Sequence, residues 1–174
     1  NLKVYGDGDF NFSLEPNGRM NLTGAYDVAG GQYEMNLYNL VNRTFRLDPS
    51  SRVTWSGDPF DAKLDVRAIY EVEASASGLM AFNSDEDFDV KNQFRQELPF
   101  LVYLNIDGEL MSPSIDFALD LPEDEQGTLG GEVYARVQQV NQQESELNKQ
   151  VFSLLVLNRF YPGSGSDGSN GGFA

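Results

Sequence analysis

Residues 2–14 carry the sequence LKVYGDGDFNFSL, in which every even position is apolar or glycine and every odd position except Tyr5 is polar. Alternation with a period of two is typical of a β-strand with one face buried and the other in water. After the turn-forming residues 16–18 the apolar and glycine residues stay on even positions from Met20 to Val28. Because facing residues in a hairpin share a face, this unchanged parity predicts a three-residue turn over 16–18, with Leu14 facing Met20.

The next change of parity predicts a second turn. Apolar residues move to odd positions at Tyr33, and Gly30-Gly31 stands between the two sets. A two-residue glycine turn accounts for the change and would place Val28 opposite Tyr33.

Further strands follow by the same rule. Parity is unchanged across Pro49-Ser50-Ser51, which predicts a hairpin in which Phe45 faces Trp55. Parity changes again across residues 57–60. Strands are then expected over 62–74, 100–110 and 115–121.

These patterns give the expected fold class and domain organisation. Residues 1–121 form a mainly β domain, a long antiparallel meander, with an excursion from the sheet at 75–99. Residues 122–162 show a helical period and predict one or two helices, of which 151–157 is apolar on nearly all sides and should be buried, with Tyr161-Pro162-Gly163 as its end. Residues 163–174 are rich in glycine and serine and are expected to be a flexible tail.

Composition excludes several classes of function. The 174 residues include 27 acidic and 12 basic side chains, for a net charge of −15, and contain no histidine or cysteine. Such a surface repels nucleic acid and anionic lipid headgroups. Catalytic triads, thiolate nucleophiles, zinc sites with histidine or cysteine ligands, and disulfides are also excluded. The chain shows no signal peptide or membrane span, and we expect it to be a soluble piece of a longer protein.

The remaining chemistry favours a protein that is not an enzyme. Asp85, Asp87 and Asp89 resemble the start of a calcium loop, but the glycine and glutamate that complete such a loop are missing. Paired carboxylates for glycoside hydrolysis would fall on the solvated side of the strands, where nothing raises the pKa of one of them. We therefore predict no catalytic residues, no metal site and no cofactor.

An apolar stripe along one side of the long strands is the strongest functional signal. It could be an ordinary core, or an open groove that shields a lipid chain of about sixteen methylenes, at about 0.8 kcal/mol for each. The candidate groove-lining residues are Phe10, Phe12, Leu14, Met20, Leu22, Tyr26, Val28, Tyr33, Met35, Phe45, Trp55, Leu64, Val66, Tyr70, Val102, Leu104 and Ile106.

Several segments, taken in their order along the chain, resemble the C-terminal domain of the TamB family, the translocation and assembly module subunit. The resemblance is to the members of this family from Bacteroidota. The matching segments are Gly31-Gln32-Tyr33-Glu34, Phe45-Arg46-Leu47, Val53-Thr54-Trp55-Ser56-Gly57-Asp58-Pro59, Leu64-Asp65-Val66-Arg67-Ala68-Ile69-Tyr70, Gly108-Glu109-Leu110 with Pro113, Ile115 and Phe117, and Val151-Phe152-Ser153-Leu154-Leu155.

The resemblance implies a curved sheet with a hydrophobic groove, called a β-taco. It also implies a periplasmic location within a longer protein anchored in the inner membrane of a Gram-negative bacterium. The expected partners are phospholipid acyl chains or unfolded β-barrel clients, with a TamA-like barrel of the Omp85 family contacted by the full-length protein. The function implied is outer-membrane biogenesis through lipid transport or protein assembly.

Two alternatives remain open at this stage. In the first, the domain docks on a barrel partner through an exposed strand edge, and the apolar stripe is ordinary core. In the second, the chain is a carbohydrate-binding sandwich whose aromatic residues stack on sugars.

Overall fold

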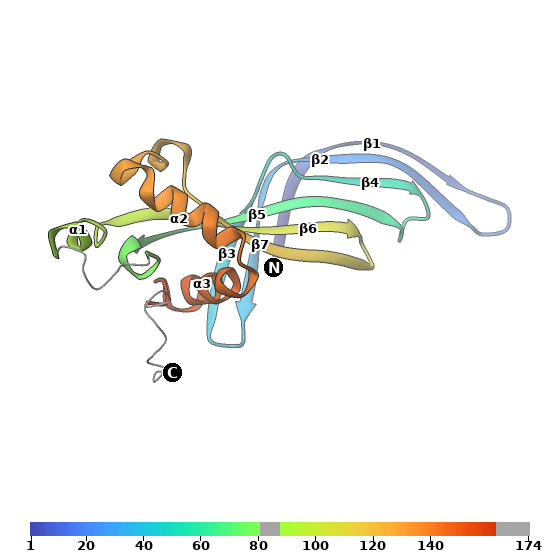
Figure 1. Cartoon of the computed structure of the whole chain (residues 1–174). Coiled ribbons are helices and arrows are strands. Elements are labelled where there is room, and N and C mark those ends of the chain that lie inside the picture. Colours follow the sequence, from blue (N-terminus) through green and yellow to red (C-terminus); the bar gives the residue numbers. More distant parts are fainter. Residues whose placement is uncertain (81–87, 163–174) are drawn as a thin grey trace. The chain divides into compact units, whose positions relative to one another are not determined.

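The computed structural model describes residues 1–80 and 88–162 and confirms a mainly β fold, with one antiparallel sheet of seven strands and short helices near the C-terminus (Figure 1). The strands are β1 Leu2–Leu14, β2 Met20–Leu37, β3 Val41–Leu47, β4 Arg52–Gly57, β5 Ala62–Ser75, β6 Glu97–Glu109 and β7 Ser112–Asp120. The helices are η1 Ala76–Gly78, α1 Phe88–Gln93, η2 Glu123–Glu125, η3 Thr128–Gly131, α2 Glu132–Asn141 and α3 Glu144–Leu157. The strand order is β1-β2-β3-β5-β6-β7, and β4 pairs with β2 and β5.

The chain divides into two compact units. Unit 1 comprises Asn1–Tyr70 and Tyr103–Asp116, and unit 2 comprises Glu71–Val102 and Phe117–Ala174. Unit 1 therefore holds β1 to β4 with the first part of β5, the last part of β6 and the first part of β7. The described helices all belong to unit 2.

The β1–β2 hairpin has the predicted register. Leu14 pairs with Met20, and Gly8 pairs with Tyr26. The backbone N–H of Glu15 donates to the carbonyl of Arg19 at 2.8 Å, which leaves residues 16–18 as the turn. Gly18 has a φ of 85°, the left-handed conformation that closes this turn without steric cost.

The prediction of a turn at Gly30-Gly31 is wrong, because β2 runs through both glycines and Tyr33 pairs with Phe45 of β3 instead of Val28. The parity changes because the register against β1 shifts here: Gly6 pairs with Val28 and Tyr5 with Gly30. One extra residue on β2, Ala29, is a β-bulge, which moves the following side chains to the other parity while the strand continues.

The prediction of a hairpin between Phe45 and Trp55 is also wrong. Both β3 and β4 run antiparallel to β2 and to β5, so the segment 48–51 joins them without reversing the chain. Ser51, buried within this segment, preserves the hydrogen bonding of the sheet. Its carbonyl accepts from the N–H of Val28 at 3.0 Å, and its hydroxyl accepts from the N–H of Arg67 at 3.0 Å.

The turn that reverses the chain after β2 is at residues 38–40 instead. Tyr38 and Asn39 have φ values of 52° and 59° there, and Leu37 pairs with Val41. The next predicted change of parity, across residues 57–60, is confirmed, because Trp55 pairs with Ala62 on β5.

The helices of unit 2 follow the predicted apolar stripes in part. Val133, Val137 and Val140 of α2 are fully buried. On α3 the buried residues of the stripe are Leu147, Val151, Leu154 and Leu155, each at most 8% exposed. However, Phe152 and Leu157 are 47% and 53% exposed, so α3 is not buried on all sides. The helix ends at Leu157, where Asn158 adopts a left-handed conformation with φ 59°, and not at Tyr161-Pro162-Gly163.

Within the predicted excursion at 75–99 the structure describes η1 and α1, and β6 already begins at Glu97. Asp85 and Asp87 of the acidic run lie outside the described residues, as does the predicted tail 163–174.

Candidate functional site

An apolar face extends across β1, β2, β4 and β5 of unit 1. Residues that pair across antiparallel strands share one face of the sheet, so the register identifies its rows. One row consists of Gly8, Tyr26, Val53 and Leu64, and the next consists of Phe10, Gly24, Trp55 and Ala62. Phe12 pairs with Leu22 and Leu14 with Met20, which continues the face to the β1–β2 turn. On the far side of the bulge, Leu2, Tyr33 and Phe45 form a further row.

Sixteen of the seventeen predicted groove residues lie in unit 1, and Val102 lies in unit 2, where it is fully buried. In unit 1, Val28, Phe45 and Leu104 are buried. The half-buried members are Leu22, Tyr26, Tyr33, Met35, Trp55, Leu64, Val66, Tyr70 and Ile106. The exposed members are Phe10 at 44%, Met20 at 45%, Phe12 at 62% and Leu14 at 65%. The exposed members of the predicted set therefore all lie in the half of the β1–β2 hairpin nearest its turn.

Glycines allow close packing on this face, of the β1 backbone at Gly24 and of aromatic rings at Gly8. Gly24 stands between Phe10 and Trp55 in the register, and the two rings meet edge to face with centroids 5.6 Å apart. A side chain at Gly24 would place its Cβ 2.1 Å from the carbonyl oxygen of Asp9, so this position cannot carry one. The rings of Phe10 and Tyr26 likewise lie over Gly8, as the pairing of Gly8 with Tyr26 suggests.

Several residues outside the predicted set also contribute apolar surface in unit 1. Val53 lies between Tyr26 and Leu64 in the register. Because Val53 is two residues from Trp55, alternation along the strand could have placed it on the same face. Val4 is 39% exposed and continues the even-numbered alternation of β1. At the β6–β7 turn Met111 is 74% exposed, a position for which alternation gives no signal because it lies between strands.

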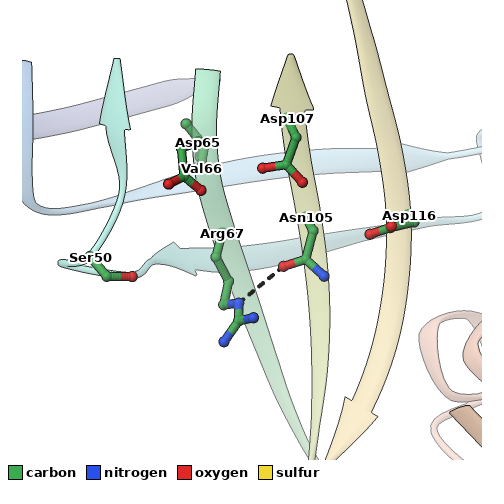
Figure 2. A pocket seen from close by; sticks show the side chains of 7 residues that line it. All are labelled: Ser50, Asp65, Val66, Arg67, Asn105, Asp107 and Asp116. Atoms are coloured by element: carbon green, nitrogen blue, oxygen red, sulfur yellow. Dashed lines mark hydrogen bonds between the residues drawn. The ribbon is translucent and has the colours of Figure 1, made fainter. Parts of the chain in front are cut away.

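Unit 1 also has a mostly polar cavity of about 350 Å³ (Figure 2). It is lined by Val66 and by six polar residues, Ser50, Asp65, Arg67, Asn105, Asp107 and Asp116. The Arg67 Nε donates to the Asn105 Oδ1 at 3.0 Å, and its guanidinium lies 4.3 Å from the centre of the Tyr103 ring. This single guanidinium is thus held by an amide and a ring while the carboxylates around it face solvent.

The described residues contain neither a cluster of metal ligands nor a helix that could span a membrane. Within residues 1–80 and 88–162, no three acidic side chains come close enough to share a metal ion. None of the helices in that part of the chain is long and apolar enough to cross a membrane.

Comparison with protein-family models gives a match to the TamB C-terminal domain over residues 1–174, the entire chain. The chain belongs to the TamB C-terminal domain family. No curated protein and no solved structure matched the chain in the corresponding searches.

Membership in the TamB family defines the general role of the chain. The family functions in TamB-type translocation and assembly, as a component of transport and assembly that is not an enzyme. Its members are periplasmic and anchored in the inner membrane, and they associate with a TamA-like partner in the module. The resemblance in the sequence is thus confirmed at the level of the family.

Proposed function

We propose that unit 1 of this TamB domain binds phospholipid acyl chains on its apolar face and shields them from water in the periplasm. The single observation that carries this proposal is the exposure of the apolar face in the part of the β1–β2 hairpin nearest its turn. Phe10, Phe12, Leu14 and Met20 are all more than two-fifths exposed although they lie on one face and in one hairpin. Exposed apolar residues that are contiguous indicate a surface used for binding, whereas scattered ones do not.

The energetics favour an acyl chain as the occupant. Transfer of about sixteen methylenes from water to an apolar surface gains on the order of 12 kcal/mol before the costs of ordering the chain. The rows of aromatic and aliphatic side chains offer dispersion contacts along the sheet. Binding of this kind selects chain length and fluidity more than chemical identity. Unfolded β-barrel clients, whose strands also alternate, are the other occupants that this surface would accept.

The proposal is tested by photo-crosslinking from the two faces of one strand. Phe12 on the apolar face and Ser13, its exposed neighbour on the opposite face, are each replaced by benzoylphenylalanine in the whole chain. After illumination with phospholipid vesicles, mass spectrometry is expected to find lipid attached at position 12 and at least about tenfold less at position 13, because only one face desolvates an acyl chain. Equal capture at both positions, or none at position 12, would refute the proposal.

A charged substitution provides a second prediction. Leu22→Asp places a carboxylate in the middle of the apolar face, where a bound acyl chain would remove its water, so lipid capture should fall about tenfold or more. Thr23→Asp adds the same charge one residue away on the opposite face and should leave capture within about twofold. Circular dichroism is used to check that both variants keep the β-sheet. If Leu22→Asp stays folded and captures lipid normally, the apolar face is not the binding surface.

One observation favours a second function, docking through a strand edge. β1 has thirteen residues and β2 is its only partner among the described strands, so its other edge is open to another strand. The crosslinking experiment separates the two functions, because benzoylphenylalanine at Phe12 would then capture protein and no lipid.

A further inference from the structure

A cavity of about 680 Å³ lies at the end of unit 1 that carries the exposed part of the apolar face. The β1–β2 hairpin extends past the end of β4, whose last paired residue is Gly57, opposite Leu22 (Figure 1). The cavity lies where the longer hairpin stands beside the β4–β5 turn. It is lined by Glu15, Arg19, Met20, Asn21, Gly57, Asp58, Pro59 and Phe60. Its volume is in the range of small-molecule binding sites, about 300–1,000 Å³.

Charges of both signs line this cavity. Glu15 and Arg19 face each other across the hairpin, joined by the backbone hydrogen bond from Glu15 N to Arg19 O. Neither side chain makes an ion pair or a hydrogen bond to any other described residue. Asp58 adds a second carboxylate, one oxygen of which accepts the backbone N–H of Phe60 at 3.0 Å. The cavity therefore offers one free guanidinium together with carboxylate oxygens.

The apolar face begins next to these charges. Glu15 and Arg19 alternate away from the apolar face, but Met20 is an exposed member of the face and also lines the cavity. The two surfaces therefore adjoin at the edge of β2, beyond the end of β4. Phe60, which is 66% exposed, adds an apolar wall to the cavity itself. A ligand that fits both surfaces is an amphiphile with a phosphate, a nearby ammonium and an apolar chain.

From this arrangement we infer that the cavity binds the headgroup of a zwitterionic phospholipid of the phosphoethanolamine type. The Arg19 guanidinium receives the phosphate, because guanidinium and phosphate oxygens form charge-assisted hydrogen bonds. Glu15 and Asp58 receive the ammonium, which donates hydrogen bonds to carboxylates. This inference rests on the proposed function, because the acyl chains of the same lipid would lie on the apolar face. An anionic lipid without an ammonium would leave both carboxylates without a cation.

The test compares two lipids that differ only in the headgroup. The whole chain with benzoylphenylalanine at Phe12 is illuminated with vesicles of equal parts dioleoyl phosphatidylethanolamine and dioleoyl phosphatidylglycerol. We expect the ethanolamine lipid to be captured roughly fivefold more than its share, the upper value for exposed ion pairs. Glu15→Gln should remove most of this preference. Arg19→Gln should lower the capture of both lipids, since both carry the phosphate.

Matched controls change the same charges elsewhere in unit 1. Glu34→Gln and Arg46→Gln alter exposed side chains outside the cavity and should leave both capture and preference unchanged. If the wild-type chain captures the two lipids equally and Arg19→Gln has no effect, the headgroup site is refuted while the apolar face stands. If no lipid is captured from either headgroup, the proposed function fails, and this inference fails with it.

Discussion

Replacing Gly31 with alanine is expected to lower the free energy of unfolding by about 3 kcal/mol or more, whereas the same change at Gly30 should alter it by less than about 1 kcal/mol. Gly31 has a φ of 139°, and an added Cβ would lie 2.2 Å from the carbonyl oxygen of Lys3 and 2.9 Å from the Cα of Val4. Both atoms belong to the backbone of β1, so the clash cannot be relieved by rotating a side chain. Alanine at this position must push the first residues of β1 away from β2.

The neighbouring glycine is a close control. A Cβ built on Gly30 meets nothing within 4 Å, and its φ lies outside the left-handed region. Alanine there even restricts the unfolded chain, which favours folding slightly. Urea denaturation followed by circular dichroism measures the two stabilities, and hydrogen exchange of the β1 amides shows whether the strand detaches in the Gly31 variant. Equal losses for the two variants would show that the close approach of β1 does not limit the side chain at position 31.

This pair of glycines also shows where prediction from the sequence ends. A two-residue turn and a single-residue bulge change the parity of a strand in the same way, and Gly30-Gly31 suits both. What separates them is the pairing of Tyr33 with Leu2 and Phe45, which are distant in the sequence. For the same reason, the unchanged parity between Phe45 and Trp55 does not distinguish a hairpin from two strands in line. Local sequence was sufficient for the hairpin over residues 16–18 and for the reversal across residues 57–60.

The candidate site was predictable to a similar degree. Alternation alone placed Phe10, Trp55 and Leu64 on one face, because the side-chain period of a strand is fixed by its backbone geometry. Alternation could not rank their exposure, since exposure depends on which strands lie nearby. The cavity beside Arg19 was beyond prediction altogether, because it exists only where a long hairpin stands beside a shorter one.

In unit 2 the helical pattern predicted the apolar stripes but missed a buried amide. Gln150 of α3 is fully buried, although glutamine is usually exposed. Its Nε2 donates to the Tyr161 carbonyl at 3.0 Å, and its Oε1 accepts from the Tyr161 N–H at 2.7 Å. Ser153, buried on the same helix, donates its hydroxyl hydrogen to the Arg159 carbonyl. The chain after α3 is thus bonded to the helix on both sides of Phe160.

Phe160→Ala is expected to destabilise unit 2 by about 3–5 kcal/mol, the usual cost of removing a buried aromatic ring. Phe160 is 3% exposed, and its ring packs edge to face on Phe100 with centroids 4.7 Å apart. The backbone of residues 159–161 is fixed by Gln150 and Ser153, so it cannot move inward to fill the space that the ring leaves. The loss should therefore include the full cost of a cavity as well as the lost transfer energy.

Phe152→Ala serves as the matched control, because it removes the same ring from α3 at a position that is 47% exposed. Its cost should be about 1 kcal/mol, in proportion to the smaller area that it buries. Thermal unfolding measures the stability that each variant loses. Hydrogen exchange of the α2 and α3 amides shows whether that stability is lost from unit 2. If the two variants lose the same stability, Phe160 is not a core residue. If Phe160→Ala costs little while Gln150→Leu costs several kcal/mol, the polar bonds stabilise this turn and the ring does not.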